Sequence, residues 1–120
     1  MEIERSFYIR VDEKGNQYPM MEFFPPKYSM LAHLGFEEFS KSDKIKYVLK
    51  EINKAIKRKQ KYSFASDDWC IVEVLGEKCI IRNGFEEFEP FEVDTSFMLN
   101  LLNDWMNFLI KYESKQIPGI

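Results

Sequence analysis

Apolar and polar residues alternate along the first part of the chain, with the period of two that is typical of half-buried β-strands. Residues 3–11 form one such run and residues 17–24 form a second. The segment 12–16 between them is rich in turn-forming residues, and Pro19 places the returning strand at a sheet edge. Residues 27–40 then form a connector, in which we expect one short helical turn.

Two later segments carry apolar residues every three or four positions, which predicts amphipathic helices. The first lies within residues 41–61, with Ser42 as its expected N-terminal cap. Its apolar residues are Ile45, Val48, Leu49, Ile52, Ala55 and Ile56. The second covers residues 96–113, with Asp94 or Thr95 as its cap, and has a wider apolar stripe. We therefore expect the second helix to be buried more deeply than the first.

The region between the helices is rich in β-forming residues. Residues 69–75 predict a central strand, which a turn at Gly76 and Glu77 joins to a returning strand over residues 78–82. Residues 61–65 are a further strand or an extended lead-in, and residues 85–93 are expected as a half-buried edge segment with its aromatics in the core. The order β-β-α-β-β-(β)-α predicts an α+β fold, with an antiparallel sheet of about four to five strands and two main helices.

The chain length and composition are those of one ordinary globular domain. Residues 1–120 are 45% hydrophobic and 16% aromatic, and residues 113–120 are expected to fray as a C-terminal tail. In the predicted hairpin, Cys70 and Cys79 lie roughly 13 Å apart along the ladder, which is too far for a disulfide. Both are expected as core residues. The chain begins without a signal-peptide pattern and has no long apolar run, so we expect a cytoplasmic protein that does not enter membranes.

The net charge of −3 conceals two regions of opposite sign. Residues 41–61 carry nine Lys or Arg against Asp43 and Glu51, a local charge of +7. The other 99 residues carry 8 basic and 18 acidic side chains, a charge of −10. This separation favours a protein partner over a small substrate.

Groups that could support catalysis are few. His33 is the only histidine, both cysteines lie on apolar strands, and no glycine-rich phosphate loop is present. Adjacent acids such as Asp67 and Asp68 are typical of solvated turns. We therefore expect no enzymatic activity, no cofactor and no metal site.

The most unusual stretch is residues 85–94, in which five acids and no basic residue alternate with large apolar residues. The charges and Pro90 would blunt an exposed sheet edge, which is one interpretation. The other is a recognition surface that attracts a basic partner, with Trp69 as an anchor. The residues expected at this surface are Glu86, Glu87, Glu89, Glu92, Asp94, Asp67, Asp68 and Trp69.

The lysine-rich helix offers an alternative surface, formed by Lys50, Lys54, Lys57 and Lys61. These cations could track a phosphate backbone in a small nucleic-acid-binding or regulatory module. A solvated helix face is the simpler interpretation, and nucleic acid is the less expected partner because the rest of the chain would repel it. In a third alternative, the chain associates with itself by joining its basic and acidic regions.

Three runs prompt a comparison with a known group: SDDWCIVEV (66–74), IIRNGFEEFEPFEV (80–93) and TSFMLNLLNDWMNFLIKY (95–112). Over roughly its C-terminal half, the chain resembles small bacterial immunity proteins, the antidotes encoded beside contact-dependent or other polymorphic toxins. The resemblance implies a cytoplasmic, non-enzymatic protein that binds and occludes a cognate toxin. Many such toxins are nucleases, so the expected contact is a cationic cleft in which carboxylates stand in for phosphates.

Overall fold

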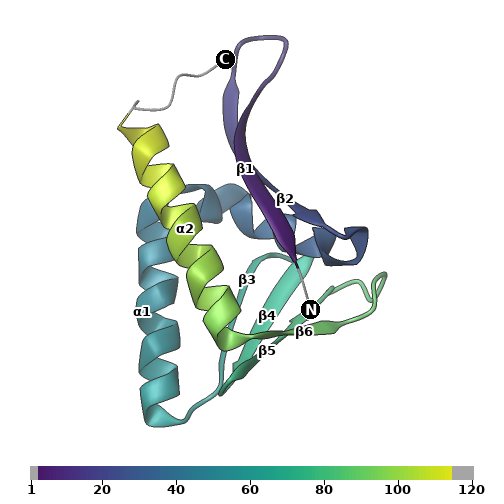
Figure 1. The fold of residues 1–120 in the computed structure, drawn as a ribbon, viewed down its shortest axis with the longest axis vertical. Coiled ribbons are helices and arrows are strands. Elements are labelled where there is room, and N and C mark those ends of the chain that lie inside the picture. Colours follow the sequence, from purple (N-terminus) through teal and green to yellow (C-terminus); the bar gives the residue numbers. More distant parts are fainter. Residues whose placement is uncertain (1–2, 115–120) are drawn as a thin grey trace.

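The structure is a computed structural model that describes residues 3–114, except for the side chains of residues 37, 38 and 66. Figure 1 shows the strands, two 3-10 helices (η) and two α-helices. In order they are β1 (Glu4–Val11), β2 (Gln17–Phe24), η1 (Pro26–Gly35), η2 (Glu37–Ser40), α1 (Ser42–Arg58), β3 (Tyr62–Asp67), β4 (Cys70–Leu75), β5 (Lys78–Arg82), β6 (Phe91–Asp94) and α2 (Thr95–Glu113). The α+β prediction is confirmed, and the predicted tail lies outside the described residues from position 115 onward.

All strand pairing is antiparallel, but the strands divide between two sheets where the sequence predicted one. β1 and β2 form a two-stranded hairpin, and the second sheet has the order β3-β4-β5-β6. The division arises because the connector is a 3-10 helix of ten residues, η1, rather than one helical turn. Tyr28, Leu31 and Leu34 of η1 are spaced three apart, the 3-10 period, and all three are buried where η1 contacts β2, β3 and β4.

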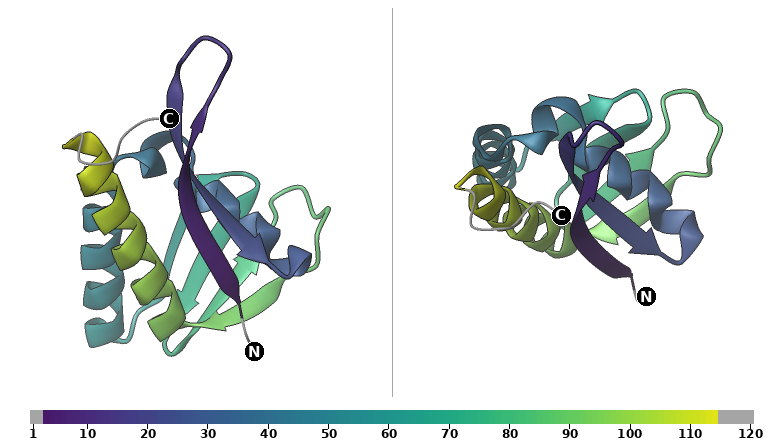
Figure 2. Two further views of the ribbon diagram at one scale, coloured as in Figure 1. Left: turned by 45° about the horizontal axis from the view of Figure 1, so that its top comes forward. Right: turned by 90° about the horizontal axis from the view of Figure 1, so that it is seen from above.

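The two α-helices run antiparallel to each other beside the four-stranded sheet (Figures 1 and 2). α1 contacts β3, and α2 contacts β5 and β6. The core forms between them, with Trp105 fully buried and its indole N–H donating to the carbonyl of Phe39 over 2.8 Å. The hairpin joins this core through Phe7, whose ring meets Trp105 edge-on at 5.2 Å. The buried apolar residues of the four-stranded sheet are Phe64, Cys70, Val72, Val74, Cys79, Ile81 and Val93.

The predicted register of the β4–β5 hairpin is confirmed. Val74 lies opposite Cys79 and Val72 opposite Ile81, and Gly76 has the positive φ of 67° that the turn requires. Cys70 and Cys79 are both free and buried. Burial raises the pKa of the Cys70 thiol to about 12 and also raises the pKa of the Cys79 thiol.

Asp94 occupies the N-cap position of α2, as predicted, but its side chain forms no capping bond, and the predicted cap of α1 is wrong because Lys41 holds that position and Ser42 is the first helical residue. The Ser42 hydroxyl donates to Glu113 Oε1 over 2.5 Å, and the Ser42 amide donates to Glu113 Oε2 over 2.9 Å. A carboxylate from the last turn of α2 therefore satisfies the first amide of α1. Asp94 accepts a bond from Lys78 Nζ at 2.6 Å, and Thr95 Oγ1 donates to the carbonyl of Gly76 at 2.7 Å.

Candidate functional site

The turn between β3 and β4 and the long loop between β5 and β6 lie side by side at one end of the sheet. The Gly84 amide donates to the Asp68 carbonyl over 2.7 Å, and Asn83 Nδ2 donates to the Trp69 carbonyl over 3.1 Å. These bonds bring Asp67, Asp68 and Trp69 next to residues 83–90, as the sequence analysis expected for a common surface. The expectation that residues 85–90 continue the sheet edge is wrong, since only Phe91–Asp94 form a strand.

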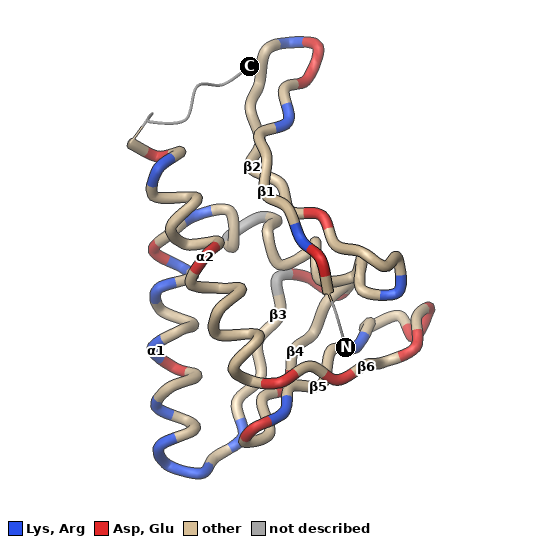
Figure 3. Tube along the Cα trace, in the orientation of Figure 1, with Lys and Arg blue, Asp and Glu red and all other residues tan. Residues whose placement is uncertain are grey.

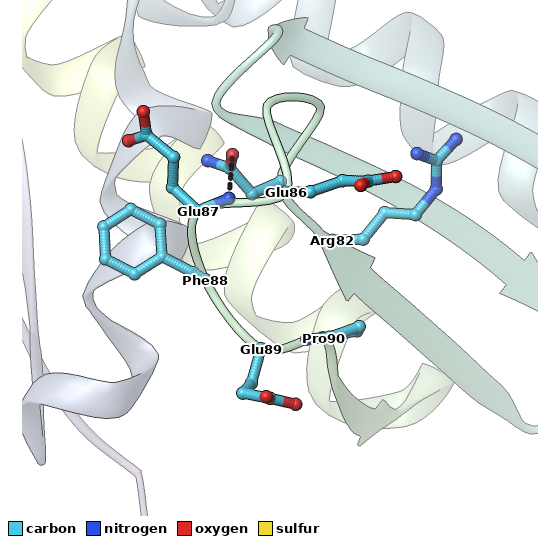
Figure 4. Close-up of a pocket in the computed structure, with 7 residues that line it drawn as sticks. Arg82, Glu86, Glu87, Phe88, Glu89 and Pro90 are labelled. Atoms are coloured by element: carbon cyan, nitrogen blue, oxygen red, sulfur yellow. Dashed lines mark hydrogen bonds between the residues drawn. The ribbon is translucent and has the colours of Figure 1, made fainter.

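The β5–β6 loop is held in shape by Asn83, whose side chain is only 3% exposed. Asn83 Oδ1 accepts the Phe85 amide at 2.9 Å and the Glu87 amide at 3.3 Å, the second of which is the dashed line in Figure 4. A Cβ on Gly84 would lie 2.7 Å from the Asp68 carbonyl oxygen, so this close approach requires glycine. Glu86 adopts a left-handed backbone with φ of 58°. The loop is therefore ordered without any partner.

Two phenylalanines of this loop are exposed to solvent, whereas the sequence predicted that they would be buried in the core. Phe85 and Phe88 are each 53% exposed, and their rings lie 5.2 and 6.3 Å from the half-buried ring of Trp69. Trp69 stacks on His33 of η1 with ring centroids 5.6 Å apart and planes 12° apart. Each exposed Phe forgoes part of the roughly 1.5–3 kcal/mol that full burial would contribute. The rings of Trp69, Phe85 and Phe88 therefore form an aromatic platform, with His33 packed against its Trp69 side.

Asp67 positions Trp69 rather than facing a partner. Its Oδ1 accepts the Trp69 amide at 2.8 Å, and its side chain is largely covered. Its Oδ2 lies 3.5 Å from His33 Nδ1, a buried nitrogen without a hydrogen bond among the described residues. His33 thus packs against Trp69 and supports its ring.

Four carboxylates, those of Asp68, Glu86, Glu87 and Glu89, surround the platform and are exposed to solvent. Among residues 3–114, no Lys or Arg forms an ion pair with any of the four. A hollow of about 400 Å³ follows the loop, lined by Glu86, Glu87, Phe88, Glu89 and Pro90 (Figure 4). Arg82 at its margin is already bonded to Glu73 over 2.5 Å. The surface is therefore negative as well as apolar.

Of the two remaining predicted acids, Glu92 borders this cluster and Asp94 lies apart from it. Glu92 is on β6 opposite Ile80 and lines a second hollow, of about 440 Å³, together with Glu89 and Pro90. Asp94 lies near the β4–β5 turn, where it forms an ion pair with Lys78, so the structure does not bring it to the acidic cluster. We define the acidic–aromatic surface as Asp68, Trp69, Phe85, Glu86, Glu87, Phe88 and Glu89.

The alternative basic face occupies a different part of the molecule. Figure 3 shows the cations gathered along α1 and the acidic loop beyond the opposite side of the sheet. Lys50, Lys54 and Lys57 lie on α1, Lys61 lies between α1 and β3, and all four are exposed. Only Lys54 among them forms an ion pair with a described residue, Glu51, at 3.1 Å.

Asn83, Gly84, Phe85 and Phe88 are the site residues that the sequence analysis did not assign to the surface. A signal for them exists in the sequence: the phenylalanines at 85, 88 and 91 are three residues apart, whereas a strand would repeat every two. The Asn83-Gly84 pair before them is typical of turns, but the side-chain hydrogen bonds of Asn83 depend on the position of the β3–β4 turn that contains Trp69.

Within residues 3–114, no group of three or more His, Cys, Asp or Glu side chains is arranged to hold a metal ion. No helix in this range combines the length and apolar character that crossing a bilayer requires. Comparison of the chain with protein-family models, characterised proteins and solved structures gave no significant match.

Proposed function

We propose that this protein is a cytoplasmic immunity protein that binds and occludes a cognate bacterial toxin, expected to be a nuclease, through its acidic–aromatic surface. One observation carries the proposal: Phe85 and Phe88 are held exposed by hydrogen bonds within their loop, among carboxylates that pair with no Lys or Arg of residues 3–114. The class of partner comes from the resemblance of residues 66–74, 80–93 and 95–112 to immunity proteins.

The arrangement of this surface suits recognition of a basic protein. Aromatic side chains at the centre of an interface supply most of its binding free energy, and a surrounding ring of charges raises the association rate. Here Trp69, Phe85 and Phe88 form the centre, and Asp68, Glu86, Glu87 and Glu89 form the ring. Because Asn83 already orders the loop, binding incurs little further loss of conformational entropy.

Inhibition by this route requires no chemistry from the inhibitor. A nuclease cleft carries Lys and Arg side chains that bind substrate phosphates. The carboxylates of Glu86, Glu87 and Glu89 can form ion pairs with those side chains in place of the phosphates. The protein then acts in a one-to-one complex, without enzymatic activity, cofactor or metal, and protects the cell as long as the complex persists.

The direct test is co-expression with the toxin domain that the proposal expects to be encoded beside this protein. The wild-type chain should restore growth of cells that express the toxin. Phe85→Ala with Phe88→Ala should lose protection, because loss of two interface anchors accelerates dissociation by about 100-fold or more. Glu87→Lys with Glu89→Lys should slow association and flatten its dependence on salt.

The matched control replaces Lys50, Lys54, Lys57 and Lys61 with Gln, which changes four charges outside the acidic–aromatic surface. This variant should protect as well as the wild type. Failure of the wild-type chain to protect or to bind the purified toxin would refute the proposal. Full protection by both loop variants would refute the assignment of the surface.

A further inference from the structure

The solvent side of α1 is a continuous row of cations. The buried residues of this helix, Ile45, Val48, Ile52 and Ala55, face the core. On the opposite side, at helical spacing, lie Lys46, Lys50, Lys54, Lys57 and Arg58, all exposed. The helix carries two acids: Asp43 is exposed in the first turn, before the row of cations begins, and Glu51 is partly buried and bonds to Lys54. From Lys46 to Arg58 these cations form a positive strip about 18 Å long on the helix.

One aromatic ring stands within this strip. Tyr47 is 54% exposed, and the ammonium of Lys44 lies 5.5 Å from its ring centroid. A tyrosine of this exposure on a helix is not needed for the core, since neighbouring Val48 fills that role. A flat ring among cations matches the combination that holds single-stranded nucleic acid: charges along the backbone and a surface on which a base stacks.

The row continues past the end of the helix. Lys59 adopts a left-handed backbone with φ of 55°, a position that glycine occupies with less strain, and its side chain is exposed. Lys61 follows and is also exposed. Lys59 is thus a cation at a position where the left-handed backbone disfavours any residue other than glycine.

We infer that this cationic face, comprising Lys46, Tyr47, Lys50, Lys54, Lys57, Arg58 and Lys61, binds single-stranded nucleic acid without sequence preference. The phosphates lie along the lysines, and one base stacks on Tyr47. A membrane surface fits less well, because the apolar side of α1 is already buried against α2 and β3 and cannot enter a bilayer. The acidic β5–β6 loop lies across the sheet from α1 (Figure 3), and salt screens the repulsion between its carboxylates and a bound polyanion. This inference does not depend on the proposed immunity function.

The test measures binding of a fluorescein-labelled 12-nucleotide oligo(dT) by anisotropy between 50 and 200 mM NaCl. If four or five phosphates are neutralised, the slope of log affinity against log salt is about −3. Replacing Lys50, Lys54, Lys57 and Lys61 with Gln should lower affinity at least tenfold at 50 mM salt and bring the slope close to zero. Tyr47→Ala should lower affinity about fivefold or more and leave the slope unchanged.

The matched control replaces Lys14, Lys27, Lys78 and Lys111 with Gln, which gives the same net charge from exposed sites elsewhere. It should retain wild-type affinity, and circular dichroism confirms that each variant is folded. Equal loss of affinity in both quadruple variants would overturn the inference. So would absence of oligo(dT) binding at 50 mM salt, or tighter binding to a 12-base-pair duplex or to vesicles containing 30% phosphatidylserine.

Discussion

Replacement of Asn83 by alanine should loosen the acidic–aromatic surface and weaken the whole fold. Asn83 is buried, and its side chain forms three hydrogen bonds with backbone groups of Trp69, Phe85 and Glu87. The side chain links the end of β5 to the start of β4, so its loss affects the sheet as well as the loop. The hydrogen bonds from the Phe85 and Glu87 amides hold the residues on either side of Glu86, which has the left-handed backbone.

The magnitude follows from these three bonds. Each contributes a net stabilisation of about 0.5–1.5 kcal/mol, which gives about 1.5–4.5 kcal/mol in total. The loop is open to solvent, so water replaces part of what the amides of Phe85 and Glu87 lose. We therefore expect Asn83→Ala to lower the free energy of unfolding by about 2 kcal/mol.

Urea unfolding followed by circular dichroism measures the global effect, and amide hydrogen exchange by NMR measures the local one. Asn83→Asp is the matched variant, since it keeps an oxygen for the Phe85 and Glu87 amides but loses the donor to the Trp69 carbonyl. Protection of those two amides should therefore disappear in Asn83→Ala and remain in Asn83→Asp.

A result that would refute the reasoning is a stability change below about 0.5 kcal/mol in Asn83→Ala, with the Phe85 and Glu87 amides still protected, because surface substitutions without structural bonds fall in that range. The loop would then be ordered by something other than Asn83. In that case the preformed state of the acidic–aromatic surface would have to be assigned to the packing of Phe85 and Phe88 on Trp69.

Two further predictions concern backbone strain and thiol chemistry. Lys59→Gly should raise the free energy of unfolding by about 0.5–1 kcal/mol, because relief of about 1–2 kcal/mol of left-handed strain exceeds the entropy that glycine adds to the unfolded chain; a lower urea midpoint than that of wild type would contradict it. At pH 8, a Cys70 pKa of about 12 leaves about one thiolate in ten thousand, so a disulfide reagent such as DTNB should label the folded protein far more slowly than the urea-unfolded chain. Because the folded pKa is raised, this thiol stabilises the fold fully below the unfolded pKa near 9, and that stabilisation is lost as the pH rises toward 12. Rapid labelling of the native protein at both cysteines would show that the hairpin core opens readily.

The parts of the fold that sequence could predict are those set by local period and turn chemistry. α1 follows from apolar residues spaced three and four apart, and the β4–β5 register follows from the glycine at position 76. The N-cap of α2 at Asp94 follows from local chemistry too, but the N-cap of α1 could not be predicted in this way. Ser42 was a reasonable cap on local grounds, but its partner Glu113 lies 71 residues away, and only packing of α2 on α1 brings them together.

The division into two sheets has a similar cause. Tyr28, Leu31 and Leu34 keep a period of three over a longer stretch than 3-10 helices usually reach, so one turn was the natural expectation. Once η1 packs against both β2 and the larger sheet, the hairpin cannot pair with that sheet. For the candidate site, the acidic residues were visible in the sequence, whereas the outward direction of Phe85 and Phe88 depends on the bonds of Asn83 to a distant turn.

The two tryptophans of the chain lie in contrasting surroundings, and this gives the molecule two intrinsic optical reporters. Trp105 is fully buried and hydrogen-bonded to Phe39, so its emission follows the integrity of the core. Trp69 lies beneath Phe85 and Phe88, where a docked partner would exclude water and quenchers. In the Trp69→Phe variant only Trp105 remains, so its fluorescence reports unfolding alone. The difference between the wild-type and variant emission spectra is the emission of Trp69, which reports on the acidic–aromatic surface. Folding and complex formation can thus be followed separately on the same unlabelled chain.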